Sequence, residues 1–559
     1  MKDLSERIYL DYLSELDGLE RFRQRFQERH PAIPLEREDP DVRRLIEAMA
    51  YFSVQTRNAT MKNLRSTWRR LFAGFFDFLL EPVPASAMIQ ALPGERMAEV
   101  VELPRGTEIR LAPADGKAGA FRLQRDLRVL PVYIERSEVV RREGGFRLIV
   151  TFRSRFTRPD PVGVLSLHVR HLDEYRTSLA VFHALQKSLE RVSVVYNEPA
   201  DAYQKGLLCK EVSFSRAPPA PDDAVAYSHP LQRLRSFFQL PEQQLFVHIQ
   251  VPTSPVDWER FSLCFDLKSD WRTGNSHHPD FFVPFSVPVT NLKREPAQVI
   301  TADGTRTEYA IRSVSTGREF SLHSVQGVYE LTKAGRAPLR PSYLPDVNAD
   351  ARKPGEQSPS YEIDETIDAS LNAHQSLIVH MPEAFTTPRK LQVEALWYQP
   401  GFAPEASGRI KATLPGRHID GLEWQVSGEV KQHLDSHLQH DMSALVHVLS
   451  MRTRSTLTRD DLIALLNYLG TPMESPFRRV LPWLRDLTVT TQPDGALRGT
   501  GIQHLYKAEF DAFDPSFEPL VVCFLDQVRE LLDVWNNEAT VELRATVAGR
   551  ELFPPKKSP

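Results

Sequence analysis

The first 80 residues carry apolar side chains at spacings of three and four positions, the pattern of amphipathic helices. A first helix is predicted to end before the HPAIP sequence at residues 30–34. A second is predicted to begin at Asp39, a favourable N-cap residue, with Pro40 in the first helical position. A third is predicted to end before Glu81. The apolar positions of the second and third helices are Val42, Leu45, Ile46, Met49, Met61, Leu64, Trp68, Leu71, Phe72, Phe75, Phe76 and Leu79.

From about residue 84 the apolar pattern changes to a period of two, which predicts β-strands. The predicted strands are 103–111, 146–156, 162–172, 245–251, 260–267, 376–399 and 539–547, with a further β region from 285 to 335. Helices are predicted near 177–191, 231–239, 440–450, 459–469 and 517–535. Strands and helices do not alternate as in βαβ units. The predicted fold class is a multidomain α+β protein, in which a helical N-terminal region precedes mostly antiparallel β-rich domains with interspersed helices.

A chain of 559 residues is too long for one hydrophobic core, so several domains are expected. The 42 prolines favour many short strands joined by turns, because proline ends helices and avoids central strands. The predicted domains are a helical region (1–82), a β-rich domain with two helices (83–284), a β-rich middle domain (285–408) and a mixed α/β C-terminal domain (409–559). A linker is predicted near 346–360.

Composition narrows the functional classes. Lys and Arg (69) nearly balance Asp and Glu (73), so the net charge of −4 does not indicate a nucleic-acid partner. The most apolar stretches fall far short of the roughly 20 residues that a membrane-spanning helix needs, and the charged N-terminus lacks the apolar centre of a signal peptide. The three widely spaced cysteines form no disulfide pattern. These observations favour a cytoplasmic protein without direct membrane insertion.

One histidine-rich segment is a candidate metal site. His433, His437 and His440 would share one face if residues 433–441 were helical, and that spacing can bind zinc. However, Leu434 stands where the metalloprotease motif places its glutamate base. A polar helix face that happens to be rich in histidine is the favoured interpretation, and a metal-dependent hydrolase remains a distant alternative.

Other candidate chemistry is sparse. His277, His278 and Asp280 could bind a metal, but a solvated turn explains them better. Cys209 and Cys264 lie in strand-like apolar runs, which are typical of buried, unreactive thiols. The sequence contains no Walker loop, dinucleotide-binding fingerprint or nucleophile elbow. No catalytic, cofactor-binding or metal site is therefore predicted.

Several sequence blocks, taken in order, resemble one protein family. They are DPDVRRLIEAMAYF (39–52), LPRGTEI (103–109), HPLQRLRSFFQLPEQQLFV (229–247), VPVTNLKREPAQV (287–299) and FLDQVRELLDVWNNEATVEL (524–543), preceded by Tyr12, Glu15, Leu16 and Leu19. The chain resembles the TssF family (also called VasA or ImpG), the baseplate subunits of bacterial type VI secretion systems. It departs from the family pattern at Lys293, where Phe is usual, and at 393–401, where a Cys-Thr-Asn-Arg segment is usual. A wedge protein of a related phage-tail-like contractile injection particle is therefore an alternative.

The resemblance implies a structural protein without catalysis or cofactors. Family members form baseplate wedges with TssG, in which more than one TssF copy joins each TssG, and they connect with TssK and TssE. The wedges surround the VgrG spike and act as a platform for polymerisation of the tail tube and sheath. The resemblance also implies a cytoplasmic baseplate that docks at the inner membrane through other subunits.

The apolar helix faces are the candidate partner surface. The residues predicted to bind a partner are Val42, Leu45, Met49, Trp68, Phe72, Phe75 and Phe76. The alternative is that the stripe packs on residues 4–26 and 61–80 of the same chain, because amphipathic helices usually bury their apolar face internally.

Overall fold

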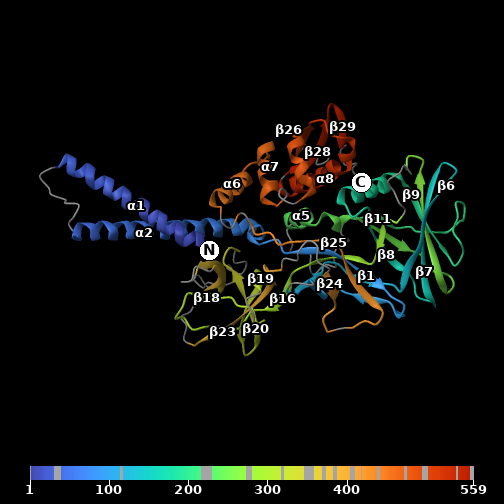
Figure 1. The fold of residues 1–559 in the computed structure, drawn as a ribbon, viewed down its shortest axis with the longest axis horizontal. Coiled ribbons are helices and arrows are strands. Elements are labelled where there is room, and N and C mark those ends of the chain that lie inside the picture. The colour runs from blue at the N-terminus through green and yellow to red at the C-terminus, as the bar shows by residue number, and fades with distance from the viewer. Residues whose placement is uncertain are drawn as a thin grey trace.

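The computed structural model describes residues 2–553 except 31–39, 114–116, 216–229, 272–279, 316–319, 345–357, 368–372, 382–386, 403–409, 417, 437, 439–440, 471–474, 494–500 and 537–538. These residues form a long helical arm mounted on a β-rich body (Figure 1). The largest hydrophobic core runs through the body from Phe72 to Leu552, and a second core lies in the middle domain. The predicted α+β fold class is confirmed.

Two helices form the arm: α1 (Lys2–Arg29) and α2 (Pro40–Leu80). The prediction of separate second and third helices is wrong, because α2 continues through 41 residues with no proline or glycine between 53 and 60 to end it. At the usual helical rise α2 is about 60 Å long. Its helical geometry breaks at Phe76 (φ −144°, ψ 45°), close to its end. The expected N-cap residue Asp39 lies outside the described residues.

A closed barrel joins distant parts of the chain. In order around the barrel its strands are β1 (Ser86–Pro93), β15 (Ser286–Thr290), β4 (Gly119–Leu123), β3 (Glu108–Pro113), β24 (Ile410–Thr413) and β25 (Leu422–Lys431). Strand β1 closes the barrel by pairing with β25. The domain divisions predicted at 284/285 and 408/409 therefore cut through a single sheet.

A glycine turn divides one predicted strand. The strand expected at 103–111 is two strands, β2 (Val101–Leu103) and β3, and β2 pairs with β5 (Leu127–Val129). Between them Gly106 has a φ of 85°, a conformation that suits glycine, and its N–H donates to the carbonyl oxygen of Leu123 at 2.8 Å. The turn changes the chain direction before β3 enters the barrel.

Two antiparallel sheets extend from the barrel into the part of the body that lies away from the arm (Figure 1). The five-stranded sheet contains β10 (Leu207–Leu208), β9 (Leu189–Tyr196), β13 (Trp258–Lys268), β7 (Gly145–Arg158) and β6 (Val132–Arg142). The four-stranded sheet contains β11 (Val212–Phe214), β12 (Phe246–Val251), β8 (Gly163–Val169) and β14 (Phe282–Pro284). The helices of this region are α3 (Tyr175–Ser188), α5 (Pro230–Gln239) and a 3₁₀ turn, η1 (Pro241–Gln244).

The middle domain has its own sheet and core. Its strands are β16 (Lys293–Pro296), β17 (Ile300–Ala302), β18 (Glu308–Ala310), β19 (Ser321–Thr332), β20 (Gly335–Pro341), β21 (Ser360–Ile367), β22 (Ala373–His380) and β23 (Arg389–Tyr398). Most of the predicted linker at 346–360 lies outside the described residues.

The C-terminal domain contains a parallel pair that the sequence pattern did not predict. Its strands are β26 (Leu484–Pro493), β27 (Ile502–Phe510), β28 (Ala539–Val547) and β29 (Arg550–Phe553), and its helices are α6 (Met442–Arg452), α7 (Arg459–Tyr468) and α8 (Glu518–Trp535), with 3₁₀ turns η4 (Pro476–Arg479), η5 (Leu481–Trp483) and η7 (Pro515–Phe517). Strands β27 and β28 pair in parallel, and α8 is their crossover connection. This βαβ unit corrects the expectation that the chain has none.

Candidate assembly site

The arm carries an apolar stripe along α2. Two runs of residues follow the alternating spacing of three and four that is typical of coiled-coil seams. They are Val42, Leu45, Met49 and Phe52, then Met61, Leu64, Trp68, Leu71 and Phe75. Val42 and Trp68 are half-buried and the other seven are exposed, Met49 at 53% and Phe75 at 59%. An apolar seam open to water suits packing against helices of another chain.

The predicted partner-binding residues fall into two groups, one on the arm and one buried where the arm enters the body. Phe72 and Phe76 are 0% and 4% exposed and belong to the large core, so the prediction of a partner surface does not hold for these two. The ring of Phe76 stacks on Trp535 of α8, with 5.5 Å between centroids. The other five, Val42, Leu45, Met49, Trp68 and Phe75, remain predicted partner residues.

Within the arm, α1 covers a narrow strip of α2. Ala50 and Val54 are buried along α2, and small side chains at these positions allow the helices to approach closely. Beside this strip, the Ser53 hydroxyl donates to Glu15 Oε1 at 2.8 Å. The alternative in which the whole stripe packs internally therefore does not apply to Leu45 and Met49, which stay exposed.

Hydrogen bonds to backbone carbonyls hold the base of the arm. The buried Arg235 of α5 donates from Nη1 to the carbonyl oxygen of Phe78 and from Nη2 to that of Glu81, the latter at 2.8 Å. The Ser436 hydroxyl donates to the carbonyl oxygen of Leu79 at 2.5 Å. The last carbonyls of a helix lack partners within the helix, and a cation at this end also interacts favourably with the helix dipole. These contacts fix where the arm leaves the body.

A buried histidine at the same junction predicts acid sensitivity. Burial, with a smaller contribution from the nearby Arg235 charge, lowers the pKa of His323 on β19 to about 4, although a hydrogen bond with the backbone of Pro82 opposes the shift. In the unfolded chain His323 titrates near its usual pKa of about 6.5. Above about pH 6.5 His323 is neutral in both states and does not affect the free energy of unfolding. As the pH falls from 6.5 towards 4, the unfolded chain binds a proton at His323 that the folded chain does not, and the free energy of unfolding falls by up to about 3 kcal/mol.

The expected result is a melting temperature that falls steadily between pH 7 and pH 5. His168 and His248, whose pKa values burial also lowers to about 4, contribute in the same direction. His323→Gln keeps a side-chain donor but does not titrate, so its melting temperature should depend less steeply on pH. Identical slopes for the variant and the wild type would contradict this assignment.

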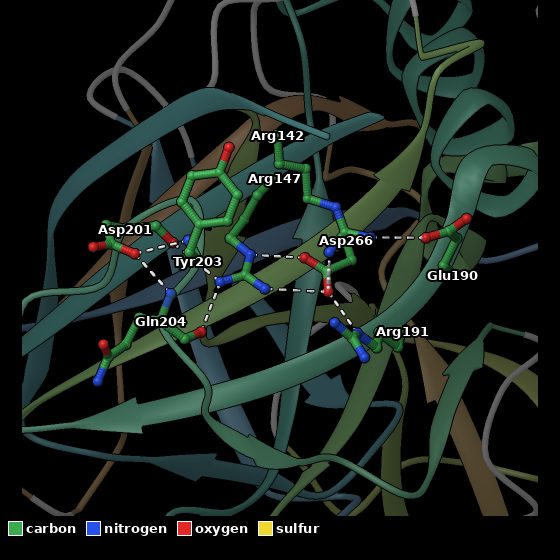
Figure 2. A network of polar contacts seen from close by, with 8 residues as sticks. All are labelled: Arg142, Arg147, Glu190, Arg191, Asp201, Tyr203, Gln204 and Asp266. Carbon is green, nitrogen blue, oxygen red and sulfur yellow. Dashed lines mark hydrogen bonds and ion pairs between the residues drawn. The ribbon is translucent and has the colours of Figure 1, made fainter. Parts of the chain in front are cut away.

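A second polar cluster joins side chains from strands β6, β7, β9 and β13 of the five-stranded sheet (Figure 2). The carboxylate of Asp266 is 0% exposed and receives Arg147 Nε at 2.7 Å, Arg191 Nε at 2.6 Å and Arg142 Nη1 at 2.7 Å. Burial disfavours its ionisation, but the hydrogen bonds from Arg147 and Arg191 outweigh burial and lower the pKa of Asp266 below its usual value. The arginine contacts thus favour the ionised form of Asp266 at neutral pH.

The same cluster also holds the loop at residues 201–204 by hydrogen bonds to its backbone. Arg147 Nη1 also donates to the backbone oxygens of Asp201 and Gln204, at 3.0 and 2.8 Å, and Arg142 pairs with Glu190 at 3.2 Å (Figure 2). These charges are engaged with one another and with the backbone, so the arrangement suits a structural clamp rather than proton transfer.

The predicted metal candidates are not assembled in the described part of the chain. Residues 433–436 are not helical: Leu434 forms an isolated bridge with Val83, and the ring of His433 packs on Tyr398 at 5.9 Å between centroids. The helical spacing proposed for a zinc site therefore fails at His433. His437, His440, His277 and His278 lie outside the described residues. Among the described residues, no group of three or more His, Cys, Asp or Glu side chains could hold a metal ion.

The sequence analysis predicted neither the Arg235 contacts at the base of the arm nor the Asp266 cluster. A weak signal was available for Asp266, because a charged residue interrupts the apolar strand RFSLCFDL. No comparable signal marked Arg235, which lies in an ordinary amphipathic helix and acquires its role from the carbonyls that α2 brings to it. In the described part of the chain, no helix combines the length and apolar character needed to cross a membrane.

A long helical arm with an open apolar seam, firmly anchored on a β-rich body, defines a class of protein: a structural subunit that assembles with other chains. The family model for "Type VI secretion system, TssF" matches residues 4–365, so the chain belongs to the TssF family. It is a structural subunit of the type VI secretion baseplate. A comparison with curated proteins finds no match.

Solved structures share the fold. A chain in the cryo-electron microscopy structure of the type VI secretion TssK-TssF-TssG baseplate subcomplex is similar at 15% identity, covering 93% of this chain and 98% of that chain, with a TM-score of 0.72. A chain in the baseplate complex from the type VI secretion system is similar at 14% identity, covering 98% of each chain, with a TM-score of 0.59. At these identities the likeness establishes the fold alone.

Proposed function

We propose that this chain is a wedge subunit whose arm packs against helices of a TssG-like partner, with more than one copy of this chain per partner. The observation that carries the proposal is the exposed seam of α2, in which seven large apolar side chains face solvent at coiled-coil spacing. Helices of a partner would cover this seam, and the anchored base would hold the arm in a fixed direction during assembly.

Further contacts are proposed with TssK, TssE and the VgrG spike. TssK accompanies TssF and TssG in the similar solved subcomplex, while TssE and VgrG follow from the family role. In this arrangement the wedges surround the spike and support growth of the tail tube and sheath. The baseplate would dock at the cytoplasmic side of the inner membrane through other subunits.

The proposed role is non-enzymatic and needs no cofactor. Burial raises the pKa of the Cys209 and Cys264 thiols to about 12 and about 11, which disfavours reactive thiolates. The Asp266 carboxylate is held by three guanidinium groups and is unavailable as a base. These features support a scaffold over the alternative of a hydrolase.

Co-expression with the TssG-like subunit tests the proposal. We expect the isolated chain to self-associate through its open seam, and the pair to purify as a stable complex whose native mass shows more than one copy of this chain per partner. A well-behaved monomer that does not bind the partner would contradict the wedge assignment. Zinc analysis of the same sample tests the alternative, because stoichiometric zinc would favour the hydrolase.

A further inference from the structure

The middle domain is an insertion in the barrel, and its two connections to the barrel lie side by side. The chain leaves the barrel after β15, forms β16 to β23 and returns to the barrel at β24. Asn291, which precedes β16, and Gln399, which follows β23, are 1% and 6% exposed. The backbone N–H of Gln399 donates to Asn291 Oδ1 at 2.8 Å, Asn291 Nδ2 donates to the carbonyl oxygen of Ala120 at 2.9 Å, and the Ala120 N–H donates to Gln399 Oε1 at 2.8 Å. These buried hydrogen bonds tie both connections to β4, so the connections do not act as flexible linkers.

The middle domain also contacts the arm. Arg70 of α2 donates from Nε to Glu362 Oε1 on β21, and Glu362 is 13% exposed whereas Arg70 is 54% exposed. The second oxygen of Glu362, Oε2, lies 3.9 Å from His380 Nε2 on β22. In Figure 1 the middle domain lies below α2, and α6, which packs against α2, lies above it. The middle domain and α6 therefore support the arm from two sides.

The contact with the middle domain lies beyond a break in the arm. The backbone of α2 is non-helical at Phe76, and the hydrogen bonds that hold the base of the arm reach carbonyls at residues 78–81, on the body side of the break. Arg70 lies about 9 Å further out along the helix. From Phe76 to Pro40 the arm is about 54 Å long, so a tilt of about 10° at the break would move its far end by about 9 Å, the distance between packed helices. Contacts outside the break are therefore needed to hold the seam in one direction.

We propose that the middle domain is a brace for the arm, in which Arg70 and Glu362 are positioning residues for capture of the TssG-like partner. The proposal rests on the wedge function proposed above, because the direction of the arm matters to a partner only if that partner binds the seam. A partly exposed ion pair adds little to the stability of the fold, but a small free energy is enough to bias the arm among directions of similar energy. A partner that meets an arm already held in one direction loses less conformational entropy on binding.

Single-molecule fluorescence energy transfer in the free chain tests the brace directly. Dyes are attached at Gln55→Cys on the arm and Lys507→Cys on the C-terminal domain, both exposed positions, in a chain that also carries Cys523→Ser. Sub-nanomolar concentrations keep the chains apart despite the open seam. The wild type should give one narrow distribution of transfer efficiency. Arg70→Glu and Glu362→Arg each place like charges at the contact, so each should broaden or shift the distribution, and combining them should restore it because the pair forms again with its charges exchanged.

Capture of the TssG-like subunit by the unlabelled chain then tests the positioning role. Glu362→Arg should weaken capture by about three- to tenfold while the melting temperature stays close to that of the wild type. Glu394→Arg is the matched control, because it reverses a charge on β23 of the same domain, where Glu394 pairs with Arg294 and Arg336. This control should leave both the transfer efficiency and the capture unchanged.

Three results would overturn the brace: an unchanged distribution in both single variants, a broadened distribution that the double variant does not restore, or an equal loss of capture in Glu394→Arg. Unchanged capture by a Glu362→Arg chain whose arm has moved would overturn the positioning role. Arg70→Glu alters an exposed residue, so it tests the contact even if Glu362→Arg unfolds the middle domain. If wild-type chain with a narrow distribution fails to bind the TssG-like subunit, the wedge proposal fails, and the brace remains a property of the free chain.

Discussion

Replacing Asp266 by alanine is expected to lower the free energy of unfolding by about 3–5 kcal/mol, because it leaves the buried Arg147 without its counter-charge. Asp266 is 0% exposed and holds Arg147 and Arg191 directly, at 2.7 and 2.6 Å. Without it the Arg147 guanidinium would stay in a dry site with only backbone acceptors from the loop at 201–204. The measurement is equilibrium denaturation of the variant against the wild type, with proteolysis near residue 201 as a local readout.

A surface ion pair provides the matched control. Asp460 pairs with Arg459 at 3.0 Å and its side chain is exposed, so Asp460→Ala should change stability by no more than about 0.5 kcal/mol. Similar losses in the two variants would show that the Asp266 cluster is no more important than an ordinary surface pair. A small loss confined to Asp266→Ala would mean that water reaches the Arg147 guanidinium when the aspartate is removed.

Met49→Glu is expected to abolish capture of the TssG-like partner while leaving the isolated chain almost as stable as the wild type. Met49 is exposed in the isolated chain, so a glutamate there remains hydrated. Inside a coiled-coil interface the same carboxylate would be buried without a partner, at a cost on the order of 3–5 kcal/mol. Capture should therefore weaken by at least about a hundredfold. Thermal melting and co-purification measure the two effects on the same sample.

Phe76→Ala should behave in the opposite way. Phe76 is 4% exposed and stacks on Trp535, so truncation should cost about 3–5 kcal/mol of stability. Any loss of capture should follow the loss of folded protein, because this ring lies in the core. If Met49→Glu instead melts early with its capture intact, the seam at Met49 is internal packing, and the partner surface must be sought around Leu71 and Phe75.

The sequence by itself determined the local elements and the family. Apolar spacing predicted α1, α3, α5 and the C-terminal helices, and alternation predicted β7, β8, β12 and β13, because these patterns depend on neighbours a few residues apart. The ordered blocks from residue 12 to residue 543 identified the TssF resemblance, and the family match over residues 4–365 confirms it. Periodicity also located the apolar face of α2, which contains Leu45 and Met49.

The tertiary structure decided what covers each face. Phe72, Phe75 and Phe76 are equivalent in sequence terms, yet the body buries Phe72 and Phe76 and leaves Phe75 exposed. Barrel closure by β1 and β25, and parallel pairing of β27 with β28, depend on contacts between distant segments that no local pattern encodes. The Asp266 cluster likewise forms only when three strands bring Arg147, Arg191 and Asp266 together. Spacing along the chain specifies which side chains share a face, whereas burial and charge pairing depend on what long-range folding places against that face.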